Sequence, residues 1–292
     1  MSIQTNVDLG FPLRLFSVGC EPKPKKNINH HSKTEFLEDV ENAVGEEVWD
    51  IVRAFPLGVI IRFVENKFTW SSKIVEHLLV NQLACKKKPE MWCLFGNTPA
   101  RFSLSEFENI TALNCEDDKK ELPLKLSRMV FDLPKFEKYP WGREAFKRLI
   151  ASVKRVNLNA NSYTLDGFVQ TLQVWAYNVV PSLGAKIGRP SNIDGPPILK
   201  FKGLKGTNNI DINLVSVADT DNIRNVFINH VTPTVSDDKV VDKKIDALLQ
   251  AICKEGGLGL VTWVEHGTKN IQMEKNTGEE VRGEAEEENE KK

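Results

Sequence analysis

Apolar side chains recur at spacings of three and four through the first two thirds of the chain, and this period predicts amphipathic helices. Four such stripes begin beside residues suited to start a helix, either as an N-cap or as a first-turn proline. Those residues are Thr34, Ser71 or Ser72, Pro140, and Thr164 or Asp166. The stripe after Thr34 runs from Phe36 to Val48, so we expect one helix there.

Residues 91–102 predict a β-hairpin that leads directly into a helix. Two short apolar stretches flank the turn-forming residues 96–99 (Gly-Asn-Thr-Pro). Ser103 stands three residues before Glu106, the spacing of a capping box, in which the hydroxyl and the carboxylate satisfy free amides at a helix start. We therefore expect a strand–turn–strand–helix unit. The β-branched stretch 59–64 fits a short buried strand or the end of a helix.

The aromatic residues of these elements are expected to form one apolar cluster that joins the hairpin to the last two helices. Its predicted members are Trp92, Phe102, Phe107, Trp141, Phe146, Phe168 and Trp175.

Composition divides the chain into five parts. They are a disordered N-terminal tail (1–33), a helical domain (34–181), a Gly/Pro linker (182–197), a smaller α/β extension (198–266) and an acidic disordered tail (267–292). In the extension we expect strands at 198–201, 210–217 and 258–264 and a helix opening at Asp237 or Asp238. The extension is short, so it should dock on the main domain. The predicted fold class is α+β and helix-rich.

The chain has 292 residues, 33.0 kDa and a net charge of −1. A chain of this length can bury a hydrophobic core that is stable without disulfides or structural metals. The near-zero charge excludes the global basic field of a dedicated nucleic-acid binder. Five cysteines argue against a disulfide framework and favour a reducing compartment. No signal peptide and no apolar run of membrane-spanning length is found, so we expect an intracellular protein away from the membrane.

Candidate metal and cofactor sites are weak. His77, Cys85 and Cys93 lie eight residues apart, whereas zinc ligands come in close pairs. Neither a phosphate-binding loop nor a dinucleotide-binding fingerprint occurs. The sequence therefore predicts no metal and no cofactor.

Candidate nucleophiles are weak as well. Cys115 precedes three carboxylates, which raise a thiol pKa and disfavour the thiolate. Cys253 could approach His266, thirteen residues later, but nothing in the spacing requires it. We expect no catalytic residues.

One basic cluster alternates with an aromatic residue, the pattern that can follow a phosphate backbone while stacking on a base. It consists of Lys200, Phe201, Lys202 and Lys205. A solvated surface is the favoured interpretation, and nucleic-acid binding is the alternative.

Several boxes occur in the order of a known family. They are 86–96 (Lys-Lys-Lys-Pro-Glu-Met-Trp-Cys-Leu-Phe-Gly), 101–107 (Arg-Phe-Ser-Leu-Ser-Glu-Phe), 111–115 (Thr-Ala-Leu-Asn-Cys), 139–146 (Tyr-Pro-Trp-Gly-Arg-Glu-Ala-Phe) and 165–181 with Leu-Asp-Gly-Phe and Leu-Gln-Val-Trp-Ala-Tyr. Over roughly 55–185 the chain resembles the plant family called domain of unknown function 1985. The chain departs from the family pattern in three places. Ala112 stands where that family usually has glycine, and Asn178 stands where an acidic residue is common. The stretch 122–132 is short and lacks an apolar segment that the family normally has there.

The resemblance implies a plant protein derived from a mobile element, with no activity or catalytic residue attached to the domain. Relatives often carry a SUMO-protease-like cysteine peptidase domain, whose nucleophile box is absent here. We therefore expect a non-enzymatic module that binds an unidentified protein partner, more plausibly in the nucleus than in the cytoplasm, with the oligomeric state open. The alternatives are a nucleic-acid or chromatin accessory, and an inactive remnant of a peptidase-containing protein.

Overall fold

The computed structural model describes residues 10–17, 19–23, 28–32, 34–116, 132–203, 212, 215 and 240–253. The strands are β1 (Ile28–His30), β2 (Met91–Phe95), β3 (Thr98–Phe102) and β4 (Tyr163–Leu165). The first helices are α1 (Phe36–Val44), α2 (Glu46–Ala54), α3 (Gly58–Glu65), α4 (Ser72–Val80), α5 (Leu104–Thr111) and α6 (Leu133–Lys138). They are followed by α7 (Trp141–Arg155), α8 (Gln170–Val179), α9 (Pro181–Leu183), a π-helix (Gly184–Gly188), a 3-10 helix (Pro197–Leu199) and α12 (Lys243–Cys253).

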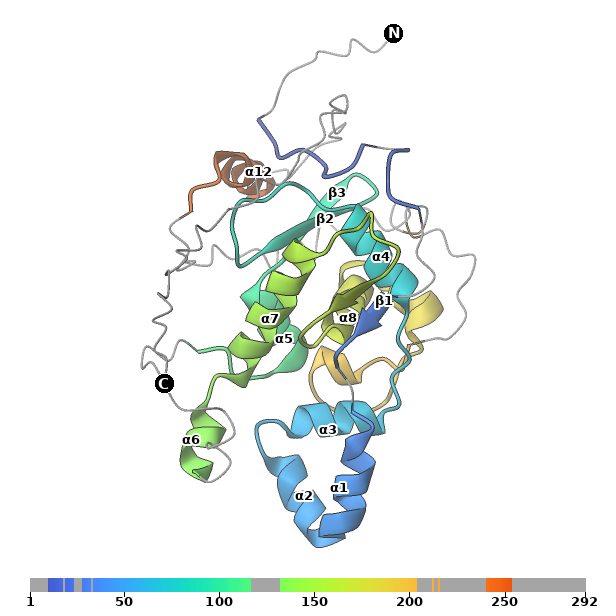
Figure 1. The fold of residues 1–292 in the computed structure, drawn as a ribbon, viewed down its shortest axis with the longest axis vertical. Helices are drawn as coiled ribbons and strands as arrows, with labels where there is room; N and C mark the ends of the chain where they lie inside the picture. The colour runs from blue at the N-terminus through green and yellow to red at the C-terminus, as the bar shows by residue number, and fades with distance from the viewer. Residues whose placement is uncertain are drawn as a thin grey trace, which may run out of the picture.

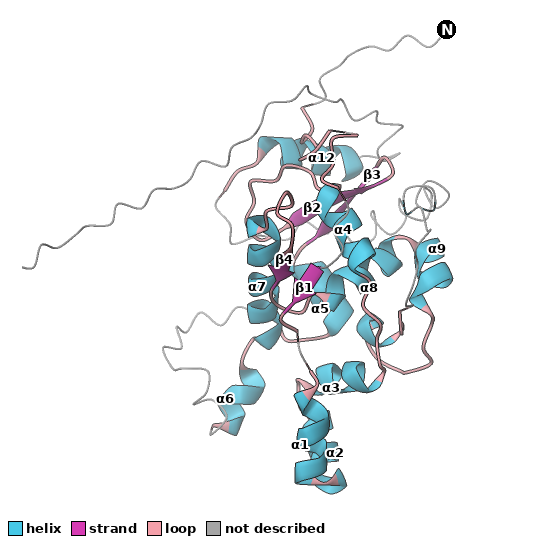
Figure 2. Cartoon of the chain, turned by 45° about the vertical axis from the view of Figure 1, so that its right-hand side comes forward, coloured by secondary structure: helices cyan, strands magenta, loops and turns pink. Residues whose placement is uncertain are grey.

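The fold is α+β and helix-rich. The described strands form two small two-stranded sheets, of which β2–β3 is buried and β1–β4 lies at the surface (Figures 1 and 2). Among the residues that the structure describes, no helix is both long and apolar enough to span a bilayer.

The predicted hairpin is present as the antiparallel pair β2–β3, in register from Met91 opposite Phe102 to Phe95 opposite Thr98. Gly96 takes a positive φ of 59° in the turn, a conformation that glycine adopts at no steric cost. All five residues of β2 are buried, and since successive strand side chains point to opposite faces, both faces of this strand are covered.

The capping box is confirmed. The Ser103 backbone N–H donates to Glu106 Oε2 at 2.7 Å, and the Ser105 N–H donates to Ser103 Oγ at 3.3 Å. Arg101 pairs with the same Glu106 carboxylate at 3.0 Å. The strand thus passes into α5 with its first amides satisfied.

Six of the seven predicted aromatic residues join one core. The ring of Phe102 lies 5.2 Å from that of Trp175 and 6.0 Å from that of Phe146. Trp92 and Phe107 are fully buried in the same cluster, and Phe168 packs on its edge.

Trp141 was predicted in this cluster and lies outside it. Its ring packs 5.0 Å from Phe136 and 4.6 Å from Tyr139, and its indole N–H donates to the Phe136 carbonyl at 2.8 Å. Trp141 precedes Phe146 by five residues, roughly 140° around a helix, so the two rings leave α7 in different directions.

The N-terminal 33 residues were predicted to be a disordered tail, and their described parts are not. Strand β1 pairs in parallel with β4, and Ile28 is buried. Further upstream, the Ala84 N–H donates to the Leu13 carbonyl at 2.7 Å. Composition could not reveal these contacts because the partners lie far along the chain.

The predicted linker 182–197 is instead packed structure. It contains the end of α9, the π-helix and the start of the 3-10 helix, and Leu183 and Ile187 are buried. A Cβ on Gly188 would lie 2.6 Å from the Phe201 ring. The glycine serves close packing here, not flexibility.

The first predicted helix is two helices, because Gly45 breaks it with a φ of 79°. The ambiguous stretch 59–64 belongs to a helix, α3. Residues 198–201 were predicted as a strand, whereas Ile198 and Leu199 lie in the 3-10 helix and Phe201 makes one isolated bridge.

The described helix of the predicted C-terminal extension, α12, packs on the core. Helix α12 begins at Lys243, later than predicted, and Asp242 accepts hydrogen bonds from Lys244 N–H and Ile245 N–H. Asp242 also accepts from the Lys86 N–H at 2.7 Å. Ile245, Leu248 and Ile252 of α12 are buried in the common core.

Within the predicted strand 210–217, the described Ile212 and Val215 are helical. The predicted strand 258–264, the tail 267–292 and most of the short stretch 122–132 lie outside the described residues.

Candidate interaction surface

Helices α1 and α2 form a hairpin that extends from one end of the molecule below α3 (Figure 1). No residue of α1 is buried, and Trp49 is the buried residue of α2. The hairpin carries five exposed large hydrophobic side chains, which we call the hairpin face. They are Phe36 (58% exposed), Val40 (39%), Val44 (37%), Val48 (46%) and Ile51 (60%).

Sequence spacing aligns these side chains. Phe36, Val40 and Val44 follow one another at intervals of four, so they lie on one side of α1. Val48 and Ile51 are three apart on α2, after the turn at Gly45. Helices α1 and α2 pack on each other, so the exposed apolar side chains of both belong to one element, and such a group of exposed apolar side chains is a candidate interaction site.

The hairpin is fixed to the domain through α2 and α3. The Trp49 indole N–H donates to Glu65 Oε1 at 3.3 Å, and Arg53 Nη2 donates to Glu65 Oε2 at 3.0 Å. Helix α3 is in turn anchored in the core by the buried Val59 and Phe63. The hairpin that carries the hairpin face is therefore fixed to the domain through α3.

The hairpin is strongly acidic. Residues 34–54 contain one basic side chain, Arg53, which pairs with Asp50 and Glu65. The acidic side chains of this range are Glu35, Glu38, Asp39, Glu41, Glu46, Glu47 and Asp50. Helix neighbours lie three or four residues apart, so Asp39 flanks Phe36, Glu41 flanks Val44 and Glu47 flanks Ile51.

The predicted nucleic-acid cluster has a different geometry. The Phe201 ring packs 5.0 Å from the Tyr177 ring and is half-buried, which leaves it poorly placed to stack on a base. Lys200 Nζ donates to the Ile193 carbonyl at 3.0 Å. Lys202 is half-buried, with its backbone N–H bonded to Gly188 and Arg189, and Lys205 lies outside the described residues. Binding by the lysines stays a prediction.

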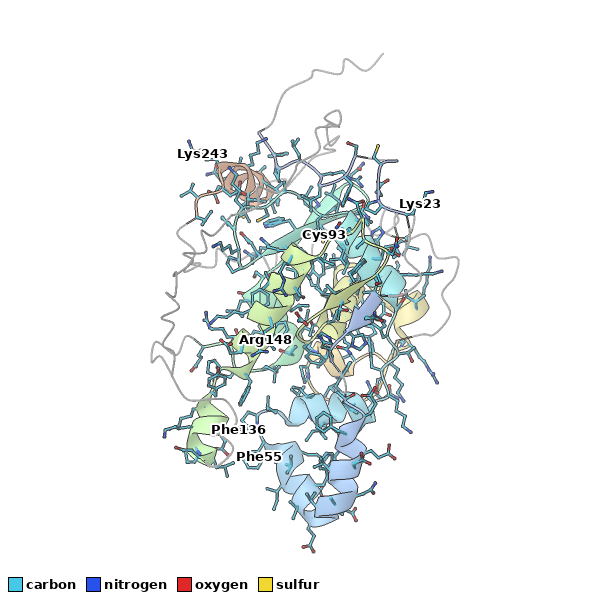
Figure 3. The ribbon with its side chains drawn as sticks, in the orientation of Figure 1. Lys23, Phe55, Cys93, Phe136, Arg148 and Lys243 are labelled. Carbon is cyan, nitrogen blue, oxygen red and sulfur yellow. The ribbon has the colours of Figure 1, made fainter. Side chains whose placement is uncertain are left out.

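Three of the described thiols, Cys85, Cys93 and Cys115, are poorly suited to nucleophilic chemistry. Burial raises the pKa of Cys85 and that of Cys115 to about 12, and burial raises the pKa of Cys93 further. Cys93 lies in the interior, where its Sγ contacts the Leu78 carbonyl oxygen at 3.2 Å (Figure 3). Cys253 is exposed, and its proposed partner His266 lies outside the described residues.

The described part of the chain contains no metal cluster. No group of three His, Cys, Asp or Glu side chains there could hold an ion. A shallow hollow of about 220 Å³ lies beside the end of α7. Its polar side chains come from Ser152, Arg155, Asn157, Ser162, Tyr163 and Thr164, and none of its lining residues is a carboxylate, histidine or cysteine.

The Trp-Gly-Arg box at the start of α7 has a structural role. The Gly142 N–H donates to the Asn114 carbonyl at 2.9 Å, and Arg143 Nε donates to the Cys115 carbonyl at 2.9 Å. A Cβ on Gly142 would lie 2.6 Å from Cys115 Sγ. The box joins α7 to the segment that follows α5.

The sequence prediction missed the hairpin face as a site. The periodicity after Thr34 predicts an amphipathic helix but does not indicate that its apolar side stays uncovered. The available signal was the density of carboxylates beside the stripe, since acidic side chains on both flanks of a narrow stripe disfavour deep burial.

The predicted resemblance to domain of unknown function 1985 spans roughly 55–185, and comparison with known families supports it over part of that range. The family model described as Domain of unknown function (DUF1985) matches residues 79–128, which include β2, β3 and α5. Neither a curated protein nor a solved structure matches the chain.

Proposed function

We propose that the chain, which matches the DUF1985 family model over residues 79–128, acts as a protein-interaction module without catalytic activity of its own. The hairpin face is the surface that we assign to the partner. Most other large hydrophobic side chains of the described residues are buried or half-buried, whereas all five of the face are exposed on adjacent helices. This contrast is the observation that carries the proposal.

The protonation of two thiols and the structural contacts of one carboxylate support the proposal that the chain has no catalytic activity of its own. Burial holds the pKa values of Cys85 and Cys115 at about 12, so these thiols stay protonated near neutral pH. Glu106 is engaged by Arg101 and by the start of α5, which are structural contacts.

The test compares the wild type with a double variant, Phe36→Ser and Ile51→Ser, in affinity purification of the tagged full chain from plant nuclear extract. We expect a discrete set of proteins to copurify with the wild type and to be lost from the double variant. Leu133→Ser is the matched control, because Leu133 is also exposed (49%) but lies on α6. Retention of the same proteins by the double variant would contradict the proposal.

We extend the proposal, on the family resemblance, to a plant protein of mobile-element origin that acts in the nucleus. Fractionation of plant cells that express the tagged chain tests the location, and exclusion from nuclei would remove that part.

A further inference from the structure

From the charges around the hairpin face we infer that its partner is a basic amphipathic helix of another protein. This inference rests on the proposed function and specifies the partner's chemistry.

The apolar spacing suits a helix. Phe36, Val40 and Val44 form a row along α1, and nine residues of α-helix extend over roughly 13 Å. A partner helix that lies along this row meets it with side chains at i, i+3, i+4 and i+7, the usual arrangement of helix recognition by an apolar surface. Val48 and Ile51 extend the contact onto α2.

The acidic side chains that border the hairpin face favour a partner with basic side chains. Asp39, Glu41 and Glu47 each stand three or four residues from a member of the hairpin face, and each is exposed. Lysine or arginine beside the apolar stripe of the partner would meet these carboxylates at the rim. Rim charges of opposite sign accelerate association and exclude partners of the wrong sign.

A second copy of the chain fits poorly. Face-to-face pairing of two hairpins would bring the acidic side chains of one against those of the other, with one arginine on each. Like-charge juxtaposition disfavours that dimer. The charge pattern therefore favours a different protein.

The direct test uses a designed probe, a fluorescent peptide of about 18 residues with leucines at i, i+3, i+4 and i+7 and lysines elsewhere. Anisotropy is measured with the folded full chain. Two control peptides are used, one with glutamate in place of lysine and one with the leucine–lysine sequence scrambled. We expect the patterned lysine peptide to bind at least about tenfold more tightly than either control.

Protein variants locate the binding. The double variant Phe36→Ser and Ile51→Ser should weaken binding by about tenfold or more, since it removes the two most exposed side chains of the hairpin face. The triple reversal Asp39→Lys, Glu41→Lys and Glu47→Lys should weaken it by about tenfold at low salt and less at high salt.

A matched reversal controls for net charge. It replaces Glu108, Glu116 and Glu137 with lysine, which changes the charge equally away from the hairpin. Circular dichroism checks that each variant is folded.

Each result has a defined consequence. Equal loss in both charge reversals means general electrostatic attraction and overturns the inference, as does equal binding of the scrambled peptide. A dimer of the wild type that the double variant abolishes assigns the face to a second copy instead. If affinity purification depends on the hairpin face but the lysine peptide does not bind, the inference fails and the proposed function stands.

Discussion

The β2–β3 hairpin and the α1–α2 hairpin have a similar plan, but the rest of the molecule buries the first and leaves the second exposed. Each consists of two short apolar segments joined at a glycine of positive φ, Gly96 in one and Gly45 in the other. All residues of β2 are buried, while none of α1 is. The difference shows that an apolar stripe in the sequence identifies side chains that favour burial, but not whether the same chain or a partner buries them.

The two hairpins differ in their surroundings. Helices α4, α5 and α12 supply side chains to the core around β2–β3, so this hairpin contributes to stability. Helix α2 has one anchored side, through Trp49 and Arg53 to Glu65, and the opposite side of the α1–α2 hairpin faces solvent. The first hairpin should therefore respond to mutation in folding and the second in binding.

Phe102→Ala should give the largest loss of stability. Its ring is fully buried and contacts those of Phe107, Phe146 and Trp175. Removal of such a ring lowers the free energy of unfolding by about 3–5 kcal/mol. The measurement is urea unfolding followed by circular dichroism.

The control for that variant is Phe36→Ala, an equal truncation on the exposed hairpin face. It should change the free energy of unfolding by at most about 0.5 kcal/mol. Comparable losses in the two variants would mean that the hairpin face is covered in solution, which would break the comparison.

Gly142→Ala should destabilise by about 1–3 kcal/mol, although glycine-to-alanine exchange within a helix ordinarily stabilises. The new Cβ would lie 2.6 Å from Cys115 Sγ and 2.8 Å from the Asn114 carbonyl oxygen, and the backbone there cannot easily yield. Asn42→Ala, at an exposed position of α1, should stay within about 0.5 kcal/mol of wild type. Stabilisation by Gly142→Ala in thermal unfolding would show that α7 does not pack closely on the segment after α5.

Ala112→Gly should stabilise the protein by about 1 kcal/mol. Ala112 ends α5 with a φ of 55°, a left-handed conformation that costs an L-residue roughly 1–2 kcal/mol and glycine far less. The readout is the midpoint of thermal unfolding, and a decrease relative to the wild type would contradict the assigned backbone conformation.

How far the sequence predicts this structure depends on the range of the interaction concerned. The capping box of Ser103 and Glu106 is local, so residue types and spacing were sufficient. The pairing of Ile28 with Tyr163 joins distant segments, and nothing near Ile28 signals it. Gly188 falls within the predicted Gly/Pro linker because composition cannot separate a glycine that bends the chain from one that lets Phe201 approach.

The candidate site shows the same limit. Periodicity predicted an amphipathic helix after Thr34 but gave no information on whether another element covers Phe36 and Val40, which is a property of the assembled fold. The lysine cluster was proposed from its alternation with Phe201, whose ring the fold directs towards Tyr177 instead.

Glu90→Gln should give the smallest effect, and one that depends on pH. Burial raises the pKa of Glu90 above its ordinary value of 4.5, against the opposing attraction of Lys87 and Arg101. The folded state then binds the proton more tightly than the unfolded state, so ionisation of Glu90 lowers the free energy of unfolding as the pH rises from about 4.5 through the folded-state pKa. Glutamine stays neutral, so the variant should gain stability relative to wild type across that window and not below it.

The matched control for this last comparison is Glu41→Gln, a carboxylate on the exposed hairpin, which should stay within about 0.5 kcal/mol of wild type at each pH. Urea unfolding at several pH values between 3 and 8 makes the measurement. A stability difference between Glu90→Gln and wild type that is constant over this range would mean that the Glu90 carboxylate is hydrated like that of Glu41. The carboxylate directly before the buried β2 strand and the one on the exposed hairpin would then have the same effect on stability at each pH.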